Sequence, residues 1–184
     1  KRILQIRDSY SDFVLPAIGI HPEFASSYTQ QDIEELENLL KREKDKIVAI
    51  GEIGLDFYWN TDNIDLQIEL FIHQLELAKR YKLPAIIHTR KSFEKAVSIL
   101  KNNTPIRAVF HCFSGNYKDA KTVIDMGWLI SFTGNITYPR SYHLREVISR
   151  IPLDRIMVET DAPYLAPQKV RGKLNKPSYI RYII

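Results

Sequence analysis

IGEIGLD, residues 50–56, indicates the fold most clearly, because three later segments repeat its pattern. They are PAIIHTR (84–90), AVFHCFSG (108–115) and IMVETDAP (156–163). Each is an apolar run of strand length that ends in a residue able to bind a divalent cation: Glu52, His88, His111 and Asp161 respectively. Buried parallel strands are apolar throughout, and barrels of such strands gather their chemistry where the strands end. The four segments therefore predict parallel strands that share one metal site.

Helical patterns alternate with the apolar runs along the whole chain. The opening residues have helical spacing, so we expect the chain to begin within a helix, with no strand before it. Thr29 with Asp32 predicts a capping box at the start of the next helix. Six strands are predicted, at residues 14–20, 47–56, 84–88, 107–113, 128–133 and 155–160.

Strands alternating with helices specify an α/β fold with a parallel sheet. One solution is an open, doubly wound sheet of six strands. The other is a (β/α)8 barrel of the TIM type that lacks its first two strands and its last helix, because such barrels usually take about 250 residues. We favour the truncated barrel, since the metal-binding residues end several strands and the sequence has no Gly-rich phosphate loop.

Composition sets limits on the class of protein. The chain has 184 residues, 45% hydrophobic and 26% charged, which suits one globular domain over residues 1–184 and excludes disordered and fibrous classes. A net charge of +4 mildly favours anionic partners, although on charge alone a solvated surface is favoured over a nucleic-acid patch. The single cysteine, Cys112, fits a reducing compartment, so we expect a cytoplasmic protein. No apolar run reaches 18 residues, so we expect no membrane partner.

Each candidate ligand has an alternative role. A carboxylate on a buried strand is costly without a cation, although Glu52 could instead pair with Arg90. His88 and His111 could each be hydrogen-bonded core residues, but two of them at matching strand ends favour ligation. Asp161 could cap a turn; Glu159 projects to the same side, and Asp161 is the better ligand because it lies nearer the strand end.

Mixed imidazole and carboxylate ligands suit zinc, manganese, iron or magnesium, and a shared carboxylate can hold two ions about 3.5–4 Å apart. Hydrolysis by a metal-activated water is the natural chemistry of such a site. Ser114 lacks the GxSxG context of a nucleophile, and Cys112 is expected to point away from His111.

Further residues are candidates for contact with a substrate. His21 ends a strand and either faces the substrate or bonds to the backbone. Arg90, Arg171 and Lys173 could bind phosphate, although a surface salt bridge is the alternative for Lys173. Four aromatic side chains flank the ligands and could stack on unpaired bases: Tyr58, Trp59, Phe113 and Tyr164. Helical spacing places His73 and His143 on exposed helix faces.

Taken in order, GIHP, IGEIGLDFY, LPAIIHTR, HCFSG, ISFTGN and ETDAPYLAP followed by RGKLN resemble the TatD family of metal-dependent deoxyribonucleases. The resemblance implies a (β/α)8 barrel of the amidohydrolase superfamily, divalent metal ions such as Mg, Mn or Zn, and 3′ to 5′ hydrolysis of DNA, with single-stranded DNA as the expected substrate. It also implies that Glu52 bridges two ions, that His88 and His111 bind one ion, and that Asp161 binds the other and assists the attacking water.

One feature of the family is absent. Its first strand ends in a His-x-His pair, and this sequence has no such pair. We therefore expect at most one ion to bind well. Two other functions stay open: hydrolysis of C–N bonds, as in other members of the superfamily, and binding of nucleic acid or a partner without catalysis. The basic RGK segment and the family motifs favour the nuclease.

Overall fold

The structure of the chain is a computed structural model that describes residues 2–59, 61–105 and 107–184. The chain separates into two compact units, Lys1–Ala108 and Val109–Ile184. The expectation of one domain over residues 1–184 stays a prediction. None of the described helices combines the length and the apolar character needed to cross a lipid bilayer.

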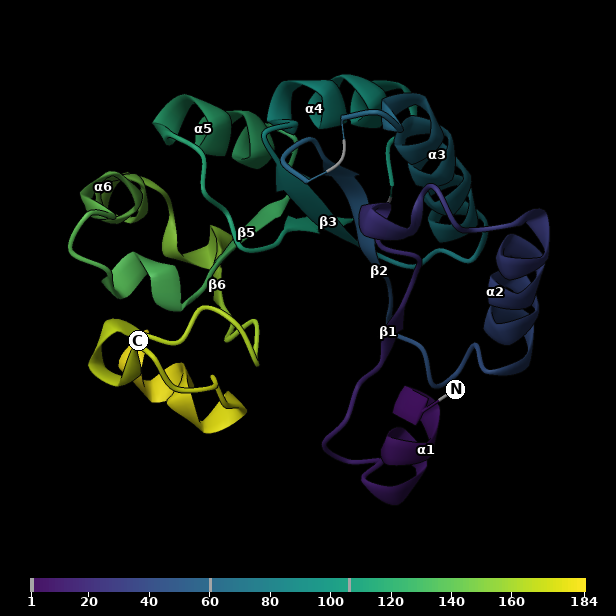
Figure 1. Cartoon of the computed structure of the whole chain (residues 1–184), viewed down its shortest axis with the longest axis horizontal. Coiled ribbons are helices and arrows are strands. Elements are labelled where there is room, and N and C mark those ends of the chain that lie inside the picture. Colours follow the sequence, from purple (N-terminus) through teal and green to yellow (C-terminus); the bar gives the residue numbers. More distant parts are fainter. Residues whose placement is uncertain (1, 60, 106) are drawn as a thin grey trace. The chain divides into compact units, whose positions relative to one another are not determined.

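Six parallel strands alternate with helices along the described chain (Figure 1). In the first unit β1 (Ala17–Ile18), β2 (Ala49–Asp56) and β3 (Ala85–Arg90) pair in chain order. The next three strands also pair in chain order: β4 (Ala108–Phe110), β5 (Leu129–Phe132) and β6 (Ile156–Val158). The helices are α1 (Arg2–Ser9), α2 (Gln30–Arg42), α3 (Ile64–Arg80), α4 (Phe93–Asn102), α5 (Tyr117–Asp125) and α6 (Tyr142–Arg150). This order confirms the predicted α/β fold of the TIM-barrel type.

Five short 3-10 helices complete the described structure: η1 (Pro22–Phe24), η2 (Gly134–Thr137), η3 (Leu153–Arg155), η4 (Gln168–Val170) and η5 (Pro177–Tyr182). At the start of α2, the predicted capping box is present in full. Thr29 accepts a hydrogen bond from the backbone N–H of Asp32, and the Asp32 carboxylate accepts one from the backbone N–H of Thr29. A second capping box, between Asn116 and Asp119, begins α5. Both helix starts thus satisfy backbone donors that have no partner within the helix.

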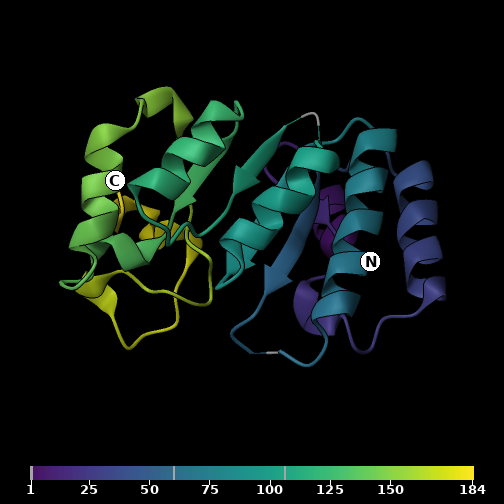
Figure 2. The same ribbon diagram turned by 90° about the horizontal axis from the view of Figure 1, so that it is seen from above.

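In the first unit α2, α3 and α4 lie side by side over the strands (Figures 1 and 2). Ile53 and Leu55 of β2 are fully buried, as are Phe71 and Leu75 on the predicted apolar face of α3. Burying an aliphatic or aromatic side chain of this size stabilises the fold by about 1.5–3 kcal/mol. This apolar layer therefore supplies the stability on which the polar end of the strands depends.

Two buried glutamines of α3 bind the backbone at the ends of two strands. Gln67 Oε1 accepts a hydrogen bond from the N–H of Asp56 at 2.8 Å, and Gln67 Nε2 donates to the C=O of the same residue at 3.0 Å. Gln74 makes the same pair of bonds with Ile20, at 2.6 and 2.9 Å. Each glutamine amide thus makes the two backbone hydrogen bonds that a neighbouring strand would otherwise make at that position.

In the second unit α5 packs against β5 and next to α6. Ala120 and Val123 of α5 are buried, together with Phe110 of β4 and Phe132 of β5. These are positions that apolar periodicity predicts for the core.

Three strands are much shorter than predicted. The predicted strand 14–20 is reduced to Ala17–Ile18, because the backbone groups of Ile20 bond to Gln74 rather than to β2. The predicted strand 107–113 ends at Phe110, since Cys112 has a left-handed backbone with φ 47°. The predicted strand 155–160 begins and ends inside its expected bounds, at Ile156–Val158.

Two smaller predictions about helices also need correction. His73 was expected on an exposed face of α3, but it is half-buried and its Nδ1 atom lies buried without a hydrogen-bond partner. Ser92 precedes α4 as expected, yet its hydroxyl does not cap the helix. It donates instead to the C=O of Leu55 at 2.6 Å and accepts from the N–H of Arg90 at 3.1 Å. His143 is exposed, as predicted.

The two glutamines predict an order of destabilisation. Gln67→Leu leaves both backbone groups of the buried Asp56 unpaired, which we expect to cost roughly 2–5 kcal/mol of unfolding free energy. Gln74→Leu affects Ile20, which water reaches in part, so we expect a loss of roughly 1–3 kcal/mol. Urea denaturation measures both, with Glu76→Gln on the exposed face of the same helix as control. Equal stabilities of the parent and both leucine variants would contradict this role.

Candidate functional site

Glu52 does not lie at the end of its strand, as the sequence indicated, but inside β2. The β2 and β3 register pairs Ile50 with Ala85 and Ile53 with Ile87, so β2 holds one extra residue in this interval. Such a bulge redirects side chains, and the side chain of Glu52 is 40% exposed. Burial therefore does not require a cation at Glu52, although the exposed carboxylate is accessible to one.

Asp56, the last residue of β2, faces His88 of β3. Asp56 Oδ2 lies 3.1 Å from His88 Nε2, and both side chains are largely buried. A metal-binding histidine commonly has a carboxylate at its other ring nitrogen, which fixes the orientation of the ring and makes it a stronger ligand. The contact therefore gives His88 the surroundings of a ligand, with Nδ1 as the atom suited to a cation.

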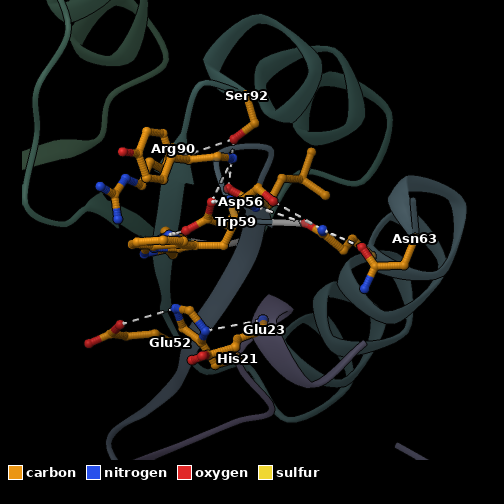
Figure 3. Close-up of polar contacts among 12 residues, drawn as sticks. His21, Glu23, Glu52, Asp56, Trp59, Asn63, Arg90 and Ser92 are labelled. Carbon is orange, nitrogen blue, oxygen red and sulfur yellow. Dashed lines mark hydrogen bonds and ion pairs between the residues drawn. The ribbon is translucent and has the colours of Figure 1, made fainter. Parts of the chain in front are cut away.

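His21 follows β1, and its ring lies between Glu52 and Glu23 (Figure 3). Its ring centroid is 4.5 Å from that of His88, and its Nε2 is 3.9 Å from Glu52 Oε2. Its Nδ1 accepts a hydrogen bond from the N–H of Glu23 at 3.2 Å. The neutral ring then carries its proton on Nε2, which suits donation to an anionic oxygen better than binding of a cation.

The donor set of the first unit fits a divalent cation. Candidate ligand atoms of His21, Glu52 and His88 lie within 4.8 Å of one another. Imidazole and carboxylate together suit zinc, manganese or iron, and the carboxylate also suits magnesium. Because the bond to Glu23 keeps a proton on His21, we assign Glu52 and His88 as the better ligands of this group. Arg90, the alternative partner of Glu52, lies instead with its guanidinium over the ring of Tyr58.

The second unit repeats the pairing of a histidine with a carboxylate. His111 directly follows β4 and is buried, and its Nδ1 lies 3.7 Å from Glu159 Oε2. Glu159 Oε1 accepts hydrogen bonds from the N–H of Cys112 at 2.6 Å and the hydroxyl of Ser131 at 2.5 Å. Burial raises the pKa of Glu159, but these contacts with His111, Ser131 and Cys112 outweigh it and lower the pKa below its usual value.

Asp161 follows β6 in a loop that Asn175 holds in place. A candidate ligand atom of Asp161 lies within 4.8 Å of one of His111. Asn175 is buried, and its amide donates to the C=O of Thr160 and of Tyr164, both at 2.6 Å. These two bonds enclose Asp161, whose backbone has a left-handed φ of 54°. The RGKLN motif therefore positions the ETDAP motif.

Each unit therefore brings some of the predicted ligands together: Glu52 with His88 in the first, and His111 with Asp161 in the second. The wider expectation, that all four converge on one spot, stays a prediction.

The predicted phosphate-binding residues are exposed. Arg171 places its guanidinium 4.5 Å from the ring centroid of Tyr138, and Lys173 is solvent-exposed. The ring of Tyr164 is also exposed, while its backbone N–H donates to the C=O of Asp161 at 2.8 Å. Their role in binding a substrate stays a prediction.

Sequence reasoning missed Asp56 and undervalued Glu159 and Asn175. Asp56 ends an apolar strand, which is the same signal that identified His88. Glu159 was weighed only as a ligand, whereas it contacts His111. No local pattern indicated that Asn175 would bind a loop more than ten residues earlier in the chain.

Comparison with known proteins places these features in a family. A sequence model described as TatD related DNase matches residues 1–184. The uncharacterized metal-dependent hydrolase YabD of Bacillus subtilis is 40% identical over 99% of this chain and 71% of its own length. The uncharacterized metal-dependent hydrolase YjjV of Escherichia coli is 36% identical over 96% of this chain and 68% of its own length.

Solved structures agree with the sequence comparison. The crystal structure of YjjV, a TatD homologue, matches with a TM-score of 0.92 at 36% identity, over 98% of this chain and 70% of that one. A hydrolase of the TatD family from Entamoeba histolytica matches with a TM-score of 0.86 at 28% identity, over 99% of this chain and 71% of that one.

The contact between Asp56 and His88 predicts an effect on metal affinity. Asp56→Asn keeps an oxygen that accepts from the loop after β2 but removes the charge beside His88. We expect Mn²⁺ to bind about 10- to 100-fold more weakly, as is typical when a partner of a ligand is lost. Titration calorimetry measures this, and the exposed Asp62→Asn in the same loop serves as control. Unchanged affinity in Asp56→Asn would remove Asp56 from the site.

The amide of Asn175 predicts a local effect on the loop that carries Asp161. Asn175→Asp keeps the size of the side chain but sets oxygen atoms against two carbonyls. We expect the loop to open and residues 160–166 to be cut by protease at least tenfold faster, as about 1.4 kcal/mol of lost local stability implies. Lys173→Ala, in the same exposed segment, should digest like the parent. Equal digestion of Asn175→Asp and the parent would show that the loop is held in another way.

Proposed function

The chain belongs to the TatD-related DNase family, and we propose that it hydrolyses phosphodiester bonds of DNA with the help of a divalent cation. One structural observation carries the proposal: each of the two candidate histidine ligands, His88 and His111, has a carboxylate at one ring nitrogen. A histidine buried for packing alone does not require that arrangement, whereas a metal-binding histidine commonly has it. The description of YabD and YjjV as metal-dependent hydrolases supports the same reading.

The residues then divide by chemical role. Glu52 and His88 would hold the cation in the first unit, and His111 with Asp161 would supply ligands from the second. When bound, a divalent cation lowers the pKa of a water molecule and offsets negative charge on a phosphoryl group. The Asp161 carboxylate is suited to accept the proton of the attacking water. The Nε2 proton of His21 is suited to a hydrogen bond with a phosphate oxygen.

We further propose single-stranded DNA as the substrate, digestion from the 3′ end, and Mg²⁺ or Mn²⁺ as the activating ion, with Zn²⁺ as the alternative. The family resemblance supports the direction of digestion. The cations Arg90, Arg171 and Lys173 support an anionic polymer as substrate.

The test is release of nucleotides from a single-stranded oligonucleotide by the parent and three variants. Glu52→Gln should bind Mn²⁺ about 10- to 100-fold more weakly and cleave more slowly at limiting metal. Asp161→Asn should keep more of the metal affinity yet lower kcat about 100-fold or more, because an amide does not accept the proton. His143→Ala, on the exposed side of α6, should match the parent within about twofold.

Two outcomes would overturn the proposal. Activity that survives chelation with EDTA would exclude a metal-dependent reaction. Parent rates in both Glu52→Gln and Asp161→Asn would exclude the assigned residues. Cleavage of a cyclic amide in place of DNA would point to C–N hydrolysis, and metal-independent binding of DNA without any cleavage would point to a binding function.

A further inference from the structure

An exposed pair of aromatic rings follows β2. The side chains of Tyr58 and Trp59 are 45% and 68% exposed. Their ring centroids are 4.7 Å apart and the ring planes are nearly perpendicular, at 89°. Edge-to-face packing of this kind holds the two rings in place but leaves a face of the indole open. An open indole face at the C-terminal end of a strand is available to a flat ligand.

Two cations lie beside the aromatic pair. The guanidinium of Arg90, at the end of β3, is 4.0 Å from the ring centroid of Tyr58 and 5.2 Å from that of Trp59. The ammonium of Lys91 is 4.9 Å from the ring of Tyr58. Cation–π attraction keeps these charges close to the rings without neutralising them. The surface therefore offers an aromatic face and positive charge together, which are the two features that a nucleotide requires.

The pair is fixed to the same carboxylate that contacts His88. Figure 3 shows Trp59 beside this carboxylate, that of Asp56. Asp56 Oδ1 accepts hydrogen bonds from the N–H of Tyr58 at 2.8 Å and of Trp59 at 3.3 Å, while Oδ2 lies 3.1 Å from His88 Nε2. Gln67 in turn holds the backbone of Asp56 from α3. The two rings are thus held in position before a ligand binds, so their side chains lose little conformational entropy when a ligand stacks on them.

We propose that Trp59 is the stacking surface for one unpaired nucleobase of the substrate, that Tyr58 supports it, and that Arg90 and Lys91 bind the adjoining phosphate. The proposal rests on the proposed function in that it takes DNA as the ligand. In a duplex both faces of a base are covered by its neighbours, so only an unpaired or end base offers a face to the indole. The platform, defined as Tyr58, Trp59, Arg90 and Lys91, therefore selects single-stranded over paired DNA at the candidate site.

Tryptophan fluorescence gives a direct test without turnover. The chain has two tryptophans, and Trp128 is buried, so Trp128→Phe leaves Trp59 as the only tryptophan, which is excited selectively at wavelengths that tyrosine does not absorb. In EDTA, which prevents metal-dependent cleavage, we expect a single-stranded oligothymidylate to quench this emission. The same oligonucleotide with an abasic residue at its 3′ end, and a fully paired duplex, should quench it much less. Anisotropy of a labelled oligonucleotide on the chain with Trp128 intact repeats the measurement without that substitution.

Variants separate stacking from charge. Stacking on one aromatic ring contributes about 1–3 kcal/mol per base, so Trp59→Ala should weaken binding roughly 5- to 150-fold. Trp59→Phe should keep part of that affinity because it retains a ring. Arg90→Ala should reduce the dependence of binding on salt, since it removes a phosphate contact. Tyr10→Ala, which removes a tyrosine of similar exposure from the segment before β1, should bind like the parent.

The outcomes distinguish this proposal from the proposed function. Equal binding of the intact and the abasic oligonucleotide, or parent affinity in Trp59→Ala, overturns the platform even if the chain hydrolyses DNA. Base-dependent binding that is lost in Trp59→Ala supports the platform even if no metal restores hydrolysis, and in that case it is the proposed function that fails.

Discussion

The candidate site depends on how the first unit satisfies the backbone at the ends of its strands. A parallel strand that stops leaves N–H and C=O groups without ladder partners, and a site at that edge must stay open to its substrate. Gln67 and Gln74 satisfy these backbone groups from α3. They are seven residues apart and so lie on one face of the helix. Each binds both backbone groups of one residue, Asp56 or Ile20. The chain is thereby fixed next to His21 and His88 without covering them.

A carboxylate beside each histidine is the second constraint. A neutral imidazole has one donor and one acceptor nitrogen, so a partner on one side decides which atom faces the other. Asp56 has this effect on His88 at 3.1 Å, and Glu159 lies near one ring nitrogen of His111, at 3.7 Å. The pKa of Glu159 is lowered despite its burial, because His111, the hydroxyl of Ser131 and the backbone N–H of Cys112 all favour its charged form. The acidic residues near the histidines therefore have two separate tasks: some orient the rings, and others remain available to a cation.

Sequence patterns predicted the elements well because apolar spacing reports burial directly. The six strands, the helices between them and the capping box at Thr29 follow from local composition and were confirmed. The positions that failed depend on contacts between distant residues. The end of β1 is set by Gln74, 54 residues away, and the placement of Glu52 by a bulge that strand alternation does not reveal. Helical spacing predicts that His73 is exposed, but spacing does not indicate how broad the buried face of α3 is.

Stability and placement therefore come from different interactions in this chain. The buried residues of β2 and α3, such as Ile53 and Phe71, make the fold stable, but apolar contacts are not directional and cannot hold a side chain at a chosen angle. Cys112 and Asp161 have left-handed backbones, which cost of order 1–3 kcal/mol each for residues other than glycine. Short hydrogen bonds stand next to both: Glu159 accepts from the N–H of Cys112, and Asn175 donates to carbonyls on either side of Asp161. Directional hydrogen bonds thus offset the backbone strain at positions next to charged groups of the site. A substitution that removes one of these hydrogen bonds can therefore displace the site even when it leaves the apolar core unchanged.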